Sequence, residues 1–228
     1  MQLSDTHLSH AAPLPHHMQA ALDWIAADPP DLVIHTGDIV WEDPDDDEDR
    51  AFARAVMDAI GPPLRVIPGN HDIGTYGDDL LRAERLDRFC ATWGDDRFLL
   101  DLAGWRLVGV DAYLLGIEEH DEWLKEAVDT DGPVAVFVHQ PITGDPADGW
   151  EMPMTARRAF MAATAGADVR LVASGHRHQF ADRGRDVWAP STTLRGEPVG
   201  PGADPRPGIV EHRFGADGSC DRRVVHLD

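Results

Sequence analysis

The sequence predicts an α/β fold, organised as one domain over residues 1–228 with helices outside central sheets. Over the first two-thirds of the chain, short apolar runs alternate with amphipathic helical patterns, whereas the last third is mostly β. The length of 228 residues, 43% of them hydrophobic, suits one large domain better than two small ones. The sequence shows no internal repeat and no interdomain linker.

The expected strands are short apolar runs bounded by turn residues, glycine or proline. The first is very short, because only four residues precede the first polar cluster. The clearest is 134–138, an uninterrupted apolar run that follows Asp131-Gly132-Pro133. In order, the strands are expected at 1–4, 32–34, 64–67, 97–102, 105–110, 134–138, 169–173, 187–189, 209–214 and 223–226.

The expected helices lie between these strands. They occupy 18–27, 78–90, 119–128 and 155–165, together with a segment containing Phe52, Val56, Met57 and Ile60. That segment follows the acidic run 43–49, which is typical of a solvated helix start because carboxylates complement the helix dipole. A cation-binding role for the run is the alternative. Pro29-Pro30 ends the first helix.

Composition argues against several classes of partner. Twenty basic and 41 acidic residues give a net charge of −21, which repels nucleic-acid backbones and anionic membranes. We therefore expect neither duplex nucleic acid nor a membrane as partner, and no run of 18 apolar residues predicts a membrane span. The N-terminus has neither the basic nor the apolar region of a signal peptide. With only Cys90 and Cys220, the chain is expected to be a reduced, cytoplasmic protein.

Polar residues that can bind metal follow five of the expected strands. They are Asp5 and His7, Asp38, Asn70 and His71, His139, and His176 and His178. Each cluster alone has a structural explanation as a turn, and Asn70 and Asp72 suit a turn of this kind. Their recurrence is different, because the ends of parallel strands lie along one edge of a sheet. By contrast, His35 lies on the strand side of Gly37 and is expected to be a core histidine.

The spacing of these residues favours a two-metal site. Asp5 with His7, and His176 with His178, are two residues apart, which in extended backbone places both side chains on one side. Mixed carboxylate and imidazole ligands suit zinc, manganese or iron. Asp38 is the best placed carboxylate to bridge two ions, because the preceding glycine lets its backbone approach closely.

The ordered blocks Asp5-Thr6-His7, Gly37-Asp38, Gly69-Asn70-His71-Asp72, His139 and Gly175-His176-Arg177-His178 resemble the calcineurin-like metallophosphoesterase superfamily. The resemblance spans residues 5–178. It implies a four-layer αββα sandwich of two mixed β-sheets flanked by helices. It also implies two divalent metal ions, manganese, iron or zinc, and hydrolysis of a small-molecule phosphoester by metal-bound hydroxide.

The resemblance further implies a role for each residue. One metal would be held by Asp5, His7, Asp38 and His178, and the second by Asp38, Asn70, His139 and His176. His71 would be the catalytic histidine that binds the phosphoryl group or protonates the leaving oxygen. Asp72 is a second catalytic candidate that would orient His71, with loop capping as the alternative. Arg177 is expected to point away from the site as a structural or rim residue.

Finer features concern the substrate. The first and third blocks lack the Asp-x-His-Gly and Asn-His-Glu patterns of protein Ser/Thr phosphatases. Residues 121–124, 136–141 and 188–192 look like bacterial class III cyclic-nucleotide phosphodiesterases, although Gln140 replaces their second histidine. We therefore expect a phosphodiesterase. The alternatives are a phosphomonoesterase, a nuclease and a non-catalytic scaffold. The loops expected to select the substrate are 74–77, 142–153 and 193–208.

Overall fold

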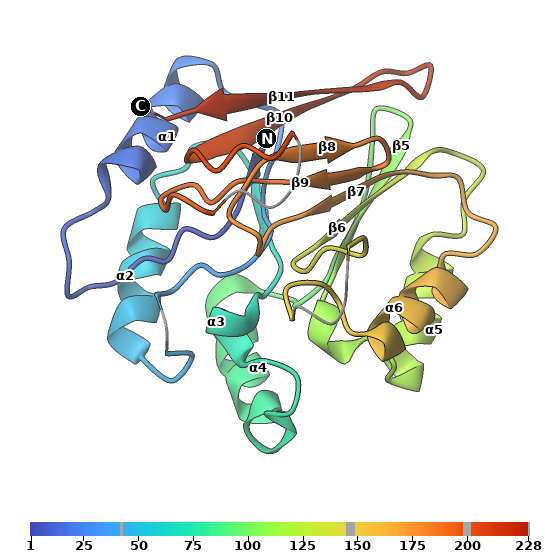
Figure 1. The fold of residues 1–228 in the computed structure, drawn as a ribbon, viewed down its shortest axis with the longest axis horizontal. Coiled ribbons are helices and arrows are strands. Elements are labelled where there is room, and N and C mark those ends of the chain that lie inside the picture. The colour runs from blue at the N-terminus through green and yellow to red at the C-terminus, as the bar shows by residue number, and fades with distance from the viewer. Residues whose placement is uncertain (42, 145–148, 198–201, 228) are drawn as a thin grey trace.

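Two mixed β-sheets form the centre of the molecule (Figure 1). The computed structural model describes residues 1–41, 43–144, 149–197 and 202–227. The first sheet has the order β11 (Cys220–His226), β10 (Gly208–Phe214), β1 (Gln2–Leu3), β2 (Val33–His35) and β3 (Leu64–Val66). The second has the order β4 (Phe98–Leu102), β5 (Trp105–Val110), β6 (Val134–Val138), β7 (Val169–Ser174), β9 (Asp186–Trp188) and β8 (Ala181–Arg183).

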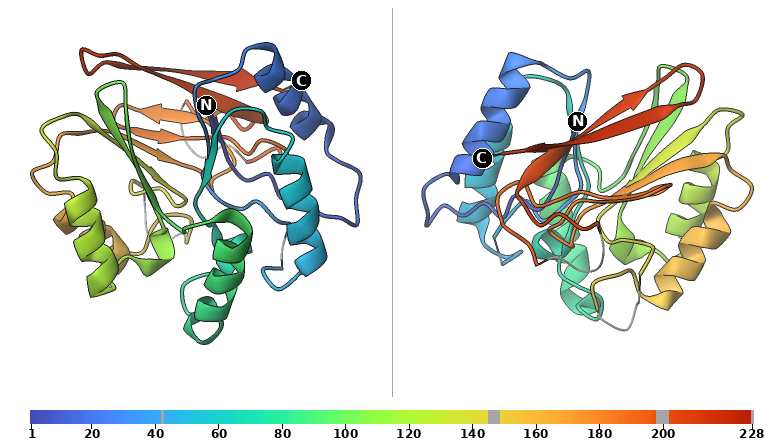
Figure 2. Two further views of the ribbon diagram at one scale, coloured as in Figure 1. Left: turned by 180° about the vertical axis from the view of Figure 1, so that it is seen from behind. Right: turned by 45° about the horizontal axis from the view of Figure 1, so that its top comes forward.

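Helices cover the outer sides of the two sheets, as Figures 1 and 2 show. They are α1 (His16–Ala27), α2 (Asp47–Met57), α3 (Asn70–Ile73), α4 (Asp79–Trp93), α5 (Glu118–Ala127) and α6 (Met154–Ala163), with a short 3₁₀ helix η1 (Ala112–Leu114). α1 and α2 lie on one side of the molecule, and α5 and α6 on the other. The predicted α/β class and four-layer sandwich are therefore confirmed.

Strand β6 shows how one element joins two layers. Its alternate residues Val134, Val136 and Val138 belong to the large core beneath the helices, whereas Ala135 and Phe137 belong to a second core. That second core also contains Ile34 of β2 and Leu171 of β7, so it lies between the sheets. Since successive side chains of a strand point to opposite faces, a strand covered on both faces must be apolar throughout.

Because the strands pair in parallel, the strands that precede the candidate residues end at the same edge of each sheet. β1, β2 and β3 pair in parallel, as do β5, β6, β7 and β9 in the other sheet. The carboxyl ends of parallel strands share an edge, so each sheet presents its strand-to-loop connections together. The functional candidates of the sequence all follow such strands.

Three local expectations need correction. Residues 70–73, read as a turn, form the helical turn α3, because the Asp72 carboxylate accepts from the Gly69 N–H at 2.9 Å and starts a helix. Strand β8 was not expected, since an edge strand with the polar residues Asp182 and Arg183 has no apolar pattern. α1 begins at His16 rather than residue 18. Parts of the expected loops at 142–153 and 193–208 lie outside the described residues.

The acidic run is confirmed as a helix start. The Asp46 side chain accepts from the N–H groups of Glu48 and Asp49, at 2.9 and 3.0 Å, and so caps α2. None of the described helices combines the length and the apolar character needed to cross a bilayer.

Candidate metal centre

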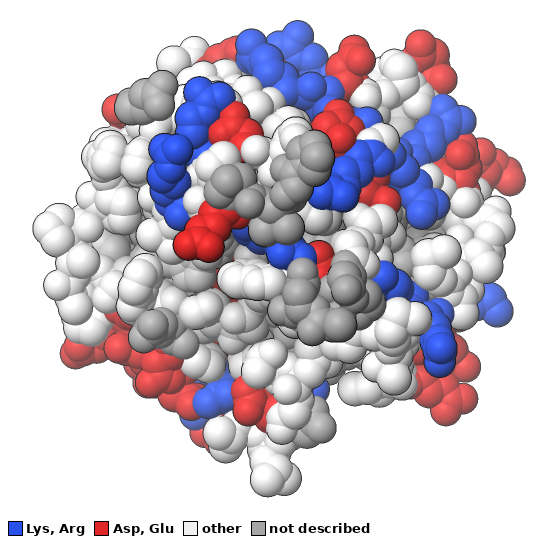
Figure 3. All heavy atoms as spheres, in the orientation of Figure 1, with Lys and Arg blue, Asp and Glu red and all other residues white. Residues whose placement is uncertain are grey.

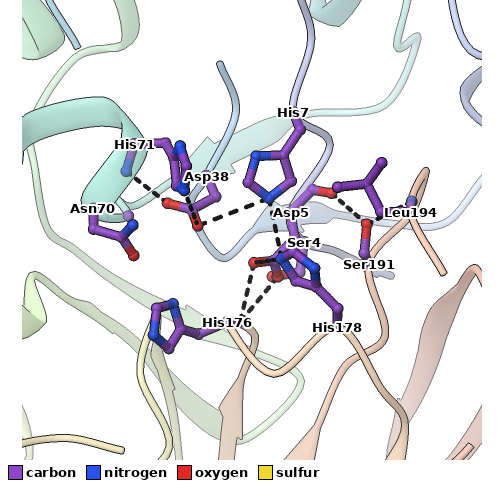
Figure 4. Close-up of polar contacts among 12 residues, drawn as sticks. Ser4, Asp5, His7, Asp38, Asn70, His71, His176, His178, Ser191 and Leu194 are labelled. Carbon is purple, nitrogen blue, oxygen red and sulfur yellow. Dashed lines mark hydrogen bonds and ion pairs between the residues drawn. The ribbon is translucent and has the colours of Figure 1, made fainter. Parts of the chain in front are cut away.

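The predicted ligands lie together at the carboxyl ends of β1, β2, β3, β6 and β7 (Figure 4). Strands of both sheets contribute, so residues far apart in the sequence become neighbours. The His139 ring, after β6, contacts the Thr36 carbonyl oxygen at 2.7 Å across the sandwich. The backbone N–H of His176, after β7, donates to the Asp5 carboxylate at 3.0 Å.

A first group of ligand atoms comes from Asp5, His7, Asp38 and His178, all within 4.8 Å of one another. His178 Nε2 lies 3.2 Å from Asp5 Oδ1 and 3.1 Å from His7 Nε2. His7 Nε2 is also 3.9 Å from Asp38 Oδ2. Two carboxylates and two imidazoles therefore point into one small volume.

A second group comes from Asp38, His139 and His176. His139 Nε2 lies 3.3 Å from Asp38 Oδ2 and 3.1 Å from His176 Nδ1. Asn70 Oδ1 is 3.3 Å from the same His139 nitrogen, which adds a neutral oxygen to the group. Asp38 belongs to both groups, so its carboxylate lies where a ligand shared by two ions would lie.

The protonation of two histidines shows what these groups can bind. The Nδ1 atoms of His7 and His139 contact the carbonyl oxygens of Trp41 and Thr36, at 3.1 and 2.7 Å. A carbonyl oxygen only accepts, so Nδ1 donates, and Nε2 is the nitrogen whose lone pair each ring offers when it is neutral. Nε2 faces carboxylate and amide oxygens, which are also acceptors, so a metal ion would take the place of a proton there. Such a convergence of acceptors fits a bound cation.

The backbone at the ligands corrects one prediction. Asp5, His7, Asp38, His176 and His178 all have a positive φ, between 43° and 67°. The inference that ligands two residues apart converge through extended backbone is therefore wrong. They sit in tight turns just past the strands, and His176 and His178 reach different groups. Left-handed backbone at residues other than glycine costs free energy and concentrates at functional sites.

Neighbouring charges shift the pKa values of the aspartates and histidines in the site. Burial opposes ionisation of Asp5 and Asp38, yet His178 beside Asp5 and His139 beside Asp38 hold both carboxyl pKa values below their usual range. Burial lowers the pKa of His139, but the charge of Asp38 outweighs it and raises that pKa to about 9. Burial and the neighbouring His139 lower the pKa of His176 to about 3. The two buried carboxylates thus favour positive charge at this point.

A family model for calcineurin-like phosphoesterases matches residues 1–180. The chain belongs to this family. The two groups of converging ligand atoms fit a metal-binding member of this family. The resemblance to this family, which rests on five sequence blocks, is confirmed.

Two curated relatives bear different activities in their names. The chain is 34% identical to the glycerophosphodiester phosphodiesterase GpdQ of Enterobacter lignolyticus over 124 residues, covering 49% of this chain and 42% of that protein. It is 26% identical to the human Serine/threonine-protein phosphatase CPPED1 over 177 residues, covering 67% and 54%. The chain spans about half the length of the curated relatives it matches.

A solved structure shares the fold. The purple acid phosphatase PPD1 of yellow lupin superposes with a TM-score of 0.74 at 13% identity, covering 98% of this chain and 50% of that one. At this identity the likeness concerns the arrangement of the two sheets and their helices.

The family's glycines allow the motifs to approach one another closely. A Cβ atom at Gly69 would collide with the Asp38 carboxylate and backbone. A Cβ atom at Gly175 would collide with the side chains of Ser4 and Asp5. Glycine is required here by close packing, because neither position has a positive φ.

The segment after β9 fastens the first motif. Ser191 Oγ donates to the Asp5 carbonyl oxygen at 2.6 Å, and Thr193 Oγ1 donates to the Thr6 carbonyl oxygen at 2.8 Å. Ser4 Oγ donates to the Asp5 carboxylate (Figure 4). Residues 188–192, noted in the sequence only for a likeness to phosphodiesterases, therefore include the hydroxyl that holds the backbone of Asp5.

Asp72 contacts backbone rather than the catalytic candidate beside it. Its carboxylate accepts from the N–H groups of Gly69, Asp38, Ile39 and Val40, at 2.9, 2.9, 3.1 and 3.3 Å. These contacts support the loop-capping alternative and join the second and third motifs. Within the described part of the chain, Nδ1 of His71 has no hydrogen-bond partner, so Asp72 does not orient that ring through a hydrogen bond.

His71 faces the centre without belonging to either group. Its backbone N–H donates to Asp38 Oδ1 at 2.9 Å, and its ring Nε2 lies 3.9 Å from Asp38 Oδ2. The ring packs edge to face on His7, with 4.7 Å between centroids. Its side chain is 28% exposed, whereas that of Asp38 is 2% exposed, so solvent reaches His71 more readily.

Other predictions outside the centre are settled by contacts. His35 is fully buried between Thr6 Oγ1, at 3.0 Å, and the Gly37 N–H, at 3.2 Å, which confirms a core histidine. Arg177 is buried and paired with Glu151, which confirms a structural residue.

Tyr113 was not predicted as a site residue, yet its hydroxyl donates to Asn70 Oδ1 at 3.2 Å. No motif marks Tyr113, because its role depends on η1 lying beside α3.

Proposed function

We propose that the chain hydrolyses a phosphodiester at a centre of two divalent metal ions. The observation that carries the proposal is Asp38, whose single carboxylate belongs to two separate groups of converging acceptors. One ion would be held by Asp5, His7, Asp38 and His178, and the other by Asp38, Asn70, His139 and His176. Bound ions of this kind polarise phosphoryl oxygens and lower the pKa of coordinated water.

His71 is proposed as the acid that protonates the leaving oxygen. It is close to the shared carboxylate yet outside both ligand groups, so its ring nitrogen stays available for a substrate. Partial exposure lets the ring meet a phosphoester that enters from solvent. Asp72 is proposed as a positioning residue, since it holds the backbone of residues 38–40 against the loop that carries His71.

The preference for a diester is supported by a relative and by sequence. GpdQ carries a phosphodiesterase name and is 34% identical over the shared part. The first and third motif blocks also depart from the pattern of protein Ser/Thr phosphatases. Hydrolysis of a monoester is the second candidate, supported by the match to CPPED1 over 67% of this chain. A scaffold without activity is disfavoured because all seven proposed ligands converge.

The charge distribution bears on an anionic substrate. The net charge of −21 opposes a phosphoester at long range. On the face shown in Figure 3, however, Lys and Arg side chains gather over the upper half, where Figure 1 places β8 to β11. Asp and Glu side chains lie among them and also form groups along the lower edges. Basic side chains are therefore concentrated on part of this face despite the negative net charge of the chain.

We further propose the identity of the metals, the extent of the domain and its cellular setting. The metals are manganese, iron or zinc, which suit carboxylate and imidazole ligands. Residues 1–228 are taken as one metallophosphoesterase domain acting on a small molecule. A reducing, cytoplasmic setting is supported by the two free cysteines, Cys90 and Cys220.

Metal analysis combined with paired assays tests the proposal. The protein is loaded separately with manganese, iron and zinc, and turnover is measured with bis(p-nitrophenyl) phosphate, p-nitrophenyl phosphate and cyclic AMP. We expect turnover of the diesters above that of the monoester. Turnover of the monoester alone would contradict the diester preference, and no turnover with any metal would contradict the hydrolase itself.

A further inference from the structure

Two exposed tryptophans lie at the metal centre. The chain has seven tryptophans, all within the described residues. Only Trp41 and Trp150 are exposed, with 42% and 46% of their surface accessible. Tryptophan is normally well buried, because its large ring gains much from leaving water. The position of both exposed rings beside one site therefore calls for an explanation.

Each ring contacts a different metal-ligand group. The Trp41 ring lies edge to face on His7, with 5.9 Å between centroids, and the Trp150 ring lies 5.3 Å from His176. His7 belongs to the first group and His176 to the second. In Figure 4 these histidines lie on opposite sides of the Asp5 and Asp38 carboxylates. An aromatic surface is thus present at each end of the centre.

The Trp150 ring is held in place by a buried ion pair. The Arg177 guanidinium lies 5.8 Å from the centre of the Trp150 ring and 5.5 Å from that of the buried Trp188. It is paired with Glu151, the residue after Trp150, and both charged side chains are almost fully buried. A ring fixed in this way loses little conformational entropy when a ligand packs on it.

We propose that Trp41 and Trp150 bind planar aromatic groups of the substrate, which is therefore an aryl or nucleobase-bearing phosphoester rather than an alkyl ester. The inference rests on the proposed function, because it takes the phosphoryl group to bind between the two rings. Stacking on tryptophan needs only a π face, which aryl groups and nucleobases share and a glycerol or methyl group lacks. Trp150, held by Arg177, would contribute more than Trp41.

A binding experiment on the metal-loaded protein tests this inference. Affinities for phenyl phosphate, AMP and methyl phosphate are measured by calorimetry for wild type, Trp150→Ala and Trp41→Ala. The conservative variants Trp150→Phe and Trp41→Phe keep a planar ring, and Leu80→Ala, at a residue 99% exposed, is the matched control. We expect Trp150→Ala to weaken an aromatic ligand about tenfold while methyl phosphate binding is unchanged.

The outcomes separate the aromatic site from a structural role. Rescue by Trp150→Phe supports stacking, and a loss confined to AMP or to phenyl phosphate identifies the aromatic group as a nucleobase or an aryl ring. An equal loss for phenyl and methyl phosphate would show that the rings only support His7 and His176, and would overturn the inference. So would unchanged affinity for both aromatic ligands.

A second experiment, which measures turnover, separates failure of this inference from failure of the proposed phosphodiesterase function. The ratio of kcat/KM for bis(p-nitrophenyl) phosphate to that for glycerophosphoethanolamine should fall in Trp150→Ala and recover in Trp150→Phe. A ratio unchanged in Trp150→Ala would contradict the inference. If no ester is hydrolysed with any metal, the proposed function fails, and the affinity ratio still decides whether aromatic ligands are preferred.

Discussion

Within the described residues, two clusters of histidine and aspartate have the composition of a metal site, and they differ in the atoms that face their carboxylates. At the metal centre, Nε2 of His7 and Nε2 of His139 both point at Asp38 Oδ2, so acceptors point at an acceptor when the rings are neutral. The second cluster, His10, Asp46 and Asp49 at the start of α2, has a similar spacing of ligand atoms. Its composition alone would not separate it from the first.

In the α2 cluster every carboxylate has a hydrogen-bond donor. Asp46 caps the helix by accepting two backbone N–H groups, and Asp49 Oδ1 accepts from the backbone N–H and ring Nδ1 of His10. His10 Nε2 lies 2.9 Å from Glu48. At the centre, Asp5 and Asp38 Oδ1 also accept from N–H or O–H donors, but Asp38 Oδ2 faces ring nitrogens of three histidines, His7, His71 and His139. This convergence of histidine rings on one carboxylate oxygen, rather than residue type, distinguishes the candidate site from the helix cap.

The largest expected effect comes from the carboxylate shared by the two groups. Asp38→Asn removes one charge from both, so phosphoesterase activity should fall by more than about a thousandfold in a steady-state assay. Asp49→Asn is the matched control at the α2 cluster and should leave activity unchanged. Comparable losses in the two variants would remove the distinction between the clusters.

His71 is expected to act in turnover and not in metal binding. His71→Ala should lower kcat by about 10²–10⁴-fold, the usual contribution of a positioned general acid, while both ions are retained. Metal content and kcat are measured on the same preparation. Full turnover in a protein that keeps both metals would exclude His71 as the acid.

Asp111 provides a third kind of buried carboxyl, of which one oxygen accepts from the Tyr113 N–H at 2.8 Å and the other has no hydrogen-bond partner within the described residues. Burial and Asp96 raise its pKa from 3.8 to about 8, and its Oδ2 has no partner among the described residues. Between pH 4 and 8 the folded state keeps a proton that the unfolded state releases, so stability falls as pH rises.

The variant Asp111→Asn should reduce that dependence. One such group changes the free energy of unfolding by up to about 1.4 kcal/mol per pH unit, and the variant lacks this contribution. Urea denaturation at several pH values measures the slope in both proteins. Equal slopes would show that Asp111 is ionised in the folded protein.

The smallest expected effect concerns the helix cap. Asp46→Ala should lower the free energy of unfolding by about 1 kcal/mol, because two N–H groups of the first turn lose their acceptor. Thermal denaturation followed by circular dichroism measures the loss, and activity should be unchanged. A loss of activity would instead assign this cluster a role in the reaction.

Local sequence patterns predicted many of the strands and the residues of the candidate metal centre. Strands β4, β5 and β6 were found from apolar runs bounded by turn residues, because periodicity and turn residues act over a few positions. The metal centre was found because each ligand directly follows a strand. The sorting of strands into two sheets depends on pairings between distant segments, such as β1 with β10, which the strand and helix patterns do not encode.

The features of the site that were not predicted from the sequence depend on long-range contacts. Tyr113 of η1 reaches Asn70 of α3, and the Trp150 ring reaches His176 after β7, although each pair is far apart in the sequence. The left-handed backbone of Asp5 and His176 was also unexpected, since aspartate and histidine occupy many conformations. In each case the deciding partner lies elsewhere in the chain.

Metal stoichiometry tests the central claim most directly. Wild type, Asp38→Asn and Asp49→Asn are equilibrated with manganese, and bound ions per chain are counted by elemental analysis after dialysis. We predict two ions in wild type, two in Asp49→Asn and at most one in Asp38→Asn. Two ions retained in Asp38→Asn, or an ion lost from Asp49→Asn, would contradict a centre built around the shared carboxylate of Asp38.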